Sequence, residues 1–265
     1  MKRRTGKNRW FEFAEKLIQT AYSIFGDAQV PITEKGAGDP KVLAKILLAR
    51  TLSNFKGTIA LTRDGMTVEA RILARCCFEN FLWIGGLQAK GDEFARAMRH
   101  EEGTSTKVRG EFIFREAIKL DEKVEKRIKA QLRDINKKWP KTKSLNVKNM
   151  AQGRMFCQAR QVYRQLSADA GHPSITSLNR YYIRKVREDG ETVRGIDVDP
   201  PPKEDELSQT LDWACEAMLK VCVEVNNILE GATAGQKLWA ILDEYQALTD
   251  ATSPIFPAHA RGDTV

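Results

Sequence analysis

Apolar residues recur at the three- and four-residue spacing of an α-helix along most of this 265-residue chain. The densest stretch, 67–88, is apolar almost all round, which predicts a central helix buried on every side. Asp64-Gly65 predicts a tight turn before it, so we expect a helix over 40–62 to pack antiparallel beside 67–88. Further helices are expected over 8–25, 121–138, 147–170, 204–229 and 236–248. The pattern predicts a mainly α fold, an irregular antiparallel helical bundle.

Two helices carry more detailed predictions. The helix over 8–25 should bury one apolar face, made of Phe11, Ala14, Leu17, Ile18, Ala21, Tyr22 and Phe25. Another helix starts at Gly91-Asp92, and the glycine it contains predicts a break near 103–106.

A small β-hairpin is predicted as an insertion near 181–198. Residues 181–186 and 192–198 alternate around Glu188-Asp189-Gly190, which is typical of a hairpin turn. We expect three segments in all. Residues 1–39 form a basic N-terminal segment with the first helix and a loop, 40–231 form the helical core domain, and 232–265 form a C-terminal helix and a mobile tail.

Composition places the chain among ordinary globular proteins, with 42% hydrophobic and 29% charged residues. The longest apolar stretch, 72–87, is interrupted by Arg75 and Glu79, so no membrane span is expected. The basic start is followed by charged residues at 12, 15 and 16 rather than by an uncharged signal region, which predicts a cytoplasmic protein. No nucleotide-binding motif is present, and three scattered histidines give no support for a metal site or a cofactor.

Charge is distributed unevenly along the chain. Residues 107–148 contain 14 Lys and Arg against 6 Asp and Glu, whereas 199–265 contain 4 against 12. A basic segment of this kind attracts RNA or another nucleic acid. Alternatively, it is a solvated helix that faces the acidic end of its own chain. Aromatic residues that could stack on bases are sparse there, with Trp139 beside the lysines, which favours the second interpretation.

The first candidate site is a polar stripe on the most apolar helix. Arg71, Arg75 and Glu79 follow at four-residue spacing and therefore share one helix face. Arginine before glutamate is the less favourable order for a pair on one helix, which suggests partners on another helix, such as Tyr163 or Arg164. The stripe is either a buried ion pair that sets the helix register or part of a functional site.

The second candidate site lies around the end of the helix 147–170. Tyr163, Arg164 and Ser167 come near that end, and His172 follows Gly171, which we expect to close the helix in a left-handed conformation. His172 either acts as a general acid or phosphate ligand there, or it only caps the last carbonyl groups. A serine hydrolase is not expected, because the sequence has no G-x-S-x-G elbow.

These residues carry a resemblance to a bacterial family known as a domain of unknown function (number 5677). The matching stretches are GMTVEARILARCCFE at 65–79, YRQLS at 163–167 and HPS at 172–174. The likeness covers roughly residues 43–229 and implies an all-α fold. The family is distantly similar to HEPN-type helical domains, many of which are ribonucleases in toxin–antitoxin and phage-defence systems.

Those ribonucleases pair an arginine with a histidine four to six residues later, and this sequence departs from that spacing. Seven residues separate Arg164 from His172, and three separate Arg96 from His100. Three functions therefore stay open. The first is a regulatory or interaction module of an accessory system such as phage defence, and helical modules of that kind often form homodimers. The second is a metal-independent ribonuclease with His172 as acid or base and Arg75 or Arg164 on the phosphate. The third is a sequence-nonspecific nucleic-acid binder.

Overall fold

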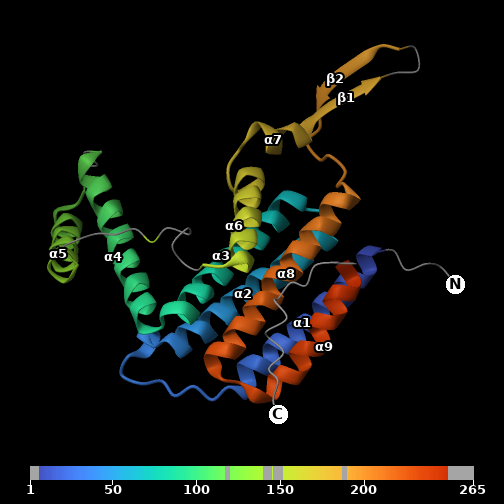
Figure 1. Cartoon of the computed structure of the whole chain (residues 1–265). Coiled ribbons are helices and arrows are strands. Elements are labelled where there is room, and N and C mark those ends of the chain that lie inside the picture. Colours follow the sequence, from blue (N-terminus) through green and yellow to red (C-terminus); the bar gives the residue numbers. More distant parts are fainter. Residues whose placement is uncertain (1–5, 117–119, 140–144, 146–151, 187–189, 250–265) are drawn as a thin grey trace.

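The computed structural model describes residues 6–116, 120–139, 145, 152–186 and 190–249. It is a helical bundle from which a pair of helices and a two-stranded hairpin project, which confirms the predicted mainly α fold with a hairpin insertion (Figure 1). The expected mobile tail and the start of the predicted helix 147–170 lie outside the described residues. Within the described ranges, no helix combines the length and the apolarity that crossing a bilayer requires.

Helices α2 (Pro40–Arg63) and α3 (Thr67–Lys90) form the predicted antiparallel pair at the centre of the bundle. The carboxylate of Asp39 caps α2 by accepting hydrogen bonds from the backbone N–H groups of Lys41 (2.8 Å) and Val42 (3.4 Å). Gly65 between the two helices has φ of 78°, a left-handed conformation that suits glycine and lets the chain reverse within a few residues. Leu48, Phe55, Phe78 and Phe81 from this pair are fully buried.

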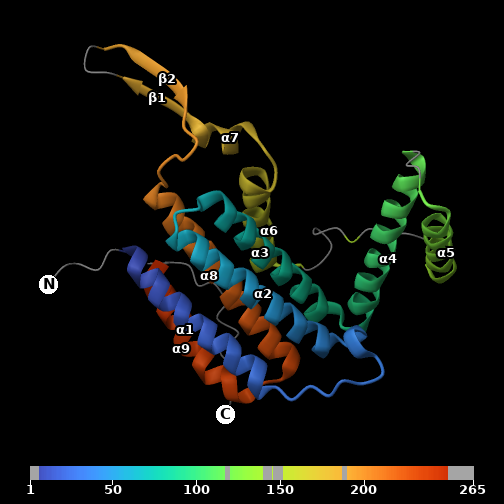
Figure 2. The same cartoon turned by 180° about the vertical axis from the view of Figure 1, so that it is seen from behind.

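Helices α1 (Gly6–Asp27), α8 (Glu204–Leu229) and α9 (Ala232–Thr249) complete the bundle, and α1 and α9 lie side by side against α8 (Figures 1 and 2). The predicted face of α1 is wrong in part: Tyr22 and Phe25 are exposed, while Phe13 and Ile24 are buried. Apolar residues occupy a wide arc of α1, and only the part of that arc that meets α8 and α9 is covered. The exposed rings instead lie under lysine ammonium groups of α2.

The helical arm consists of α4 (Asp92–Arg115) and α5 (Glu122–Lys138). The predicted break near 103–106 is wrong, because α4 continues through Gly103 and Gly110. These glycines serve packing between helices. A Cβ atom at Gly103 would lie 2.9 Å from Trp139, and one at Gly110 would lie 2.9 Å from Leu132, so both positions let the α5 segment approach closely.

The β arm consists of β1 (Tyr182–Val186) and β2 (Thr192–Ile196), paired antiparallel with Tyr182 opposite Ile196. The chain reaches it through α6 (Arg154–Leu166), a π-helical turn η3 (Ser167–Gly171), α7 (Ile175–Leu178) and a short turn η4 (Asn179–Tyr181). The predicted left-handed cap at Gly171 is wrong, because the wide π-helical turn ends the helix and Gly171 keeps a negative φ. Both views show the helical arm and the β arm projecting from opposite ends of α3 (Figures 1 and 2).

Candidate functional site

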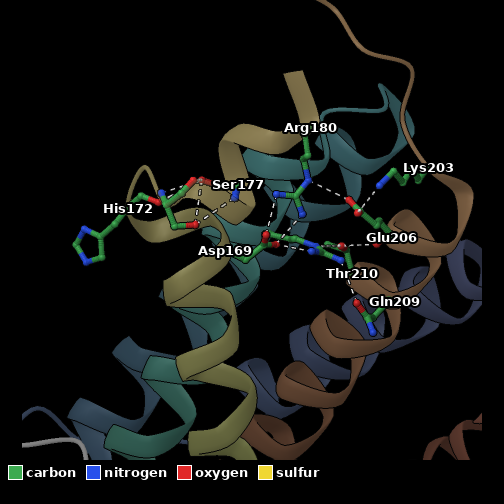
Figure 3. Close-up of polar contacts among 10 residues, drawn as sticks. Asp169, His172, Ser177, Arg180, Lys203, Glu206, Gln209 and Thr210 are labelled. Atoms are coloured by element: carbon green, nitrogen blue, oxygen red, sulfur yellow. Dashed lines mark hydrogen bonds and ion pairs between the residues drawn. The ribbon is translucent and has the colours of Figure 1, made fainter. Parts of the chain in front are cut away.

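A buried network of Arg71, Asp169, Arg180 and Glu206 joins α3, η3, η4 and α8 (Figure 3). Arg71 Nη1 donates a short hydrogen bond to Asp169 Oδ2, and Arg180 Nη2 donates to the same oxygen at 2.9 Å. Arg180 Nη1 lies 2.7 Å from Asp169 Oδ1. This contact is an ion pair but not a hydrogen bond. Arg180 Nε donates to Glu206 Oε2 at 3.1 Å. Two guanidinium groups and two carboxylates therefore neutralise one another inside the protein.

The remaining donors of Arg71 are also occupied. Its Nε donates to Thr210 Oγ1 at 3.1 Å and its Nη2 to Gln209 Oε1 at 3.0 Å, both on α8. The guanidinium carbon lies 5.5 Å from the ring centre of Trp213 on the same helix. Arg71 therefore ties α3 to α8, and each of its three guanidinium nitrogens has a partner within the protein.

Asp169 is ionised in this network. Burial alone would raise the pKa of its carboxyl group, but the hydrogen bonds and positive charges of Arg180 and Arg71 outweigh burial and hold the pKa below its ordinary value. Burial would lower the pKa of Arg180, and the hydrogen bonds and charges of Asp169 and Glu206 raise it instead. Asp169 and Arg180 therefore face each other as a carboxylate and a guanidinium cation.

A second group, the Arg75 cluster, consists of Arg75, Glu79, Tyr163 and Ser167 and lies between α3 and α6. Arg75 Nη2 donates to Tyr163 Oη at 2.6 Å, and Nε donates to Ser167 Oγ at 2.8 Å. The guanidinium carbon lies 4.6 Å from the Tyr163 ring centre. The contact of Arg75 Nη1 with Glu79 Oε2 is long, 3.5 Å, and the two side chains are 25% and 35% exposed. The predicted buried Arg75–Glu79 pair is therefore a half-exposed one, whereas the predicted contact of Arg75 with Tyr163 is present.

Two of the six candidate residues lie apart from this cluster. Arg164 is exposed on α6. His172 is exposed in extended backbone after η3, and its ring points away from the buried network (Figure 3). The carbonyl oxygen of His172 accepts a hydrogen bond from the backbone N–H of Ser174, which begins the capping box of α7 with Ser177. The structure thus brings together Arg75, Glu79, Tyr163 and Ser167 but not Arg164 or His172.

Sequence reasoning missed the partners that complete the buried network. Glu206 and Thr210 follow at four-residue spacing on α8, a polar stripe that could have signalled a buried contact. Arg180 belongs to a single short turn and has no periodicity that could reveal it.

A crevice of about 440 Å³, the arm crevice, lies between the two helices of the helical arm. It is lined by Arg96 and Arg99 from α4 and by Lys138 and Trp139 at the end of α5, together with the carboxylates of Glu102 and Asp134. The Trp139 indole lies against Gly103, 5.1 Å from the ring centre of His100 and 5.8 Å from Lys138 Nζ. An aromatic face beside three cations is a suitable place for a base and its phosphate.

A larger pocket of about 580 Å³, the base pocket, lies where the β arm leaves the bundle. Its apolar walls come from the turn before α3, from the base of the β arm and from the prolines before α8: Met66, Val68, Tyr181, Val198 and Pro200–Pro202. Asp64, Glu69 and Asp199 add carboxylates to its lining. The lining of the base pocket is therefore part apolar and part charged, with four carboxylates, including Glu206, against the two cations Arg180 and Lys203.

Metal ligands and buried thiols are two further kinds of group in the described part of the chain. There, no group of three or more His, Cys, Asp or Glu residues is placed to hold a metal ion. Burial raises the pKa of the thiols of Cys77, Cys215 and Cys222, so these three are protonated at neutral pH and are poor nucleophiles.

The fold and these sites define a class of protein: a helical bundle that is held by buried arginine ion pairs and carries two projecting arms. The chain belongs to a family of unknown function (DUF5677), whose model matches residues 41–191. The matched region contains α2 to α6, the helical arm, the Arg75 cluster and the first strand of the β arm. No curated protein and no solved structure matches the chain.

Proposed function

We propose that this protein is a non-enzymatic interaction module that binds single-stranded nucleic acid, without sequence preference, along the helical arm. The observation that carries the proposal is the shape and charge of α5. Its apolar residues Val124, Ile128, Leu132 and Ile135 form one stripe, and Leu132 of that stripe contacts α4 at Gly110. The seven cations of α5 occupy roughly the opposite half of the helix circumference.

The basic half of α5 is open to solvent. Lys123, Arg127, Arg133 and Lys137 are all exposed, and Lys126 and Lys129 pair with glutamates of the same helix. The cations of α5 thus form a continuous face that can follow a phosphate backbone.

The arm crevice supports single-stranded rather than double-stranded nucleic acid. Trp139 is half-buried beside Arg96, Arg99 and Lys138, so a base that leaves the strand could stack on the indole while its phosphate meets the cations. A base paired within a duplex cannot enter a crevice of this kind.

The arginines of the bundle interior support binding rather than catalysis. Each guanidinium nitrogen of Arg71 has an internal hydrogen-bond partner, Arg180 forms ion pairs with Asp169 and Glu206, and Arg75 is held by Tyr163 and Ser167. His172, the acid or base of the ribonuclease alternative, points away from the buried network (Figure 3). No observation in this geometry favours the ribonuclease over the binding module.

Fluorescence anisotropy with an end-labelled single-stranded RNA tests the proposal, with single-stranded DNA and duplex DNA of the same sequence as comparisons. We expect both single strands to bind more tightly than the duplex. The triple variant Arg127→Glu, Arg133→Glu, Lys137→Glu should lose measurable binding, and Trp139→Ala should weaken binding of the single strands roughly 10-fold. Recovered RNA should be intact on a denaturing gel.

A matched control carries the same change in charge away from the helical arm: Arg9→Glu, Arg154→Glu, Lys237→Glu. All three residues are exposed on helices of the bundle, so this variant should bind nucleic acid much more like the wild type than the α5 variant does. Equal loss in both variants would show that net charge alone controls binding. Absence of binding by the wild type at low salt, or cleavage of the RNA, would overturn the proposal.

A further inference from the structure

The β arm and the segments on either side of it expose several large apolar side chains. Ile175, Ile196 and Val198 are 75%, 81% and 91% exposed, and Leu178 and Tyr182 are also exposed. These residues lie on α7, on the two strands and on the segment that leads back to α8. Large apolar side chains that stay in water are typical of an interaction site, and Val198 among them also lines the base pocket.

Two strands alone give the β arm little stability of its own. An isolated two-stranded hairpin is marginally stable in water, and both of its outer edges carry unpaired backbone groups. Arg184 lies directly opposite Arg194 in the register, and both side chains are exposed. Like charges placed opposite each other destabilise a hairpin unless an anion lies between or beside them.

The base pocket has the complementary properties. Part of its lining is apolar, and the carboxylates of Asp64, Glu69 and Asp199 carry negative charge beside that apolar part. Glu206 at its inner side is already paired with Arg180 and Lys203. The β arm of the same chain cannot fill the pocket with its outer residues, because it projects away from the bundle (Figures 1 and 2).

We propose that two copies of this chain form a dimer in which the β arm of each copy lies on the base pocket of the other. Tyr182 and Ile196 cover the apolar walls, and Arg184 and Arg194 meet the carboxylates of Asp64 and Asp199. One chain supplies both the arm face with Arg184 and Arg194 and the carboxylates of the pocket, so a twofold axis makes both contacts at once. The interface does not involve the helical arm and is independent of nucleic-acid binding.

Multi-angle light scattering across a concentration series gives the first test. The wild type should reach a mass of ~60 kDa, which is twice the chain mass of 30.0 kDa. The arm variant Arg184→Glu, Arg194→Glu and the pocket variant Asp64→Lys, Asp199→Lys should each weaken the dimer roughly 100-fold or more, because like charges then face each other. Circular dichroism of both variants should match the wild type, since all four residues are exposed.

A mixture of the two variants gives the sharper test. The reversed arm of the first variant matches the reversed pocket of the second, and their two natural surfaces also match. The mixture should therefore form a heterodimer although each variant alone is a monomer. The charge-matched control Arg9→Glu, Arg154→Glu should remain dimeric.

Three results would overturn the proposal. The first is a wild type that stays at 30.0 kDa throughout the series. The second is a pocket variant that dimerises normally while the arm variant does not, which would indicate pairing of arm with arm. The third is a dimer that survives both reversals, which would place the interface elsewhere.

Discussion

The carboxylate of Asp169 lies between the guanidinium groups of Arg71 and Arg180 and is the shared acceptor of both. Removing it would leave two buried cations with Glu206, which pairs with Arg180, as the remaining carboxylate of the network. We expect Asp169→Ala to lower the free energy of unfolding by ~3–5 kcal/mol. Urea denaturation followed by circular dichroism measures this loss.

Glu79→Ala is the matched control for that prediction. Glu79 also pairs with an arginine of α3, but the contact is long and the side chain is 35% exposed, so its removal should cost ~1 kcal/mol or less. Equal losses in the two variants would contradict the distinction between the buried network and the half-exposed Arg75 cluster.

Asp212 gives the stability of the protein an unusual dependence on pH. Burial raises the pKa of its carboxyl group to about 6, although the hydrogen bond from Tyr245 Oη at 2.7 Å acts in the opposite direction. The folded protein therefore holds this proton more tightly than the unfolded chain does. The contribution to stability is greatest below pH ~4 and is lost as pH rises to about 6, by ~1–3 kcal/mol.

Asp212→Asn should remove this dependence, because the amide cannot ionise. The variant should be more stable than the wild type at pH 8, and the difference should close as pH falls toward 4. Chemical denaturation of both proteins at several pH values measures the difference. A difference that stays constant with pH would contradict the raised pKa. Asp169 does not obscure the test, because its lowered pKa places its own loss of stability below pH ~4.

At the scale of elements, the helical arm depends on the close approach of α5 to the glycines of α4. Gly110 is buried, and a Cβ atom there would lie 2.9 Å from Leu132. We expect Gly110→Val to push α5 away from α4 and to raise hydrogen exchange of the amides of α5, with exchange in α3 and α8 unchanged. RNA affinity should fall as well, because the arm crevice would lose its second wall.

Gly26→Ala serves as the comparison for Gly110→Val. No atom lies within 4 Å of a Cβ at Gly26, so alanine there should keep or slightly raise stability through its better helix propensity. Unchanged exchange in α5 of Gly110→Val would show that the arm does not depend on this contact.

The elements that could be predicted from the sequence are those set by local signals. Pro40 after Asp39 begins α2, Asp64-Gly65 ends it, and the hairpin register follows from alternation around a turn. The errors at Gly103 and Gly171 have a different cause. In a sequence, a glycine indicates a break in a helix. At Gly103, however, the missing side chain makes room for Trp139, and the local sequence pattern does not predict this contact.

Local signals also predicted part of the candidate site. Four-residue spacing placed Arg75 on the same helix face as Arg71 and Glu79. The unfavourable order of Arg75 before Glu79 then predicted a partner on another helix, and the contact with Tyr163 is such a partner. The buried network joins residues 98 apart, Arg71 and Asp169, with Arg180 from an aperiodic turn. Contacts of that kind depend on how the bundle packs, so single-helix periodicity could not reveal them.

At the scale of the whole molecule, the bundle lies between the two binding surfaces that we propose. Helix α3 has 24 residues, so the arms at its ends are separated by roughly 36 Å of helix. The central helices are held by apolar packing and by the buried network, while each arm presents charged and apolar groups outward. This arrangement is suited to holding a nucleic acid at one end and a second copy of the chain at the other.

The dependence of RNA affinity on salt tests the proposed function most directly. A plot of log affinity against log salt concentration falls by about 0.7 for each phosphate contact of a single strand. The variant Arg127→Glu, Arg133→Glu, measured where it still binds, should therefore have a slope smaller by at least ~1.4 than the wild type. An unchanged slope, or an affinity that salt does not alter, would contradict binding along the basic face of α5.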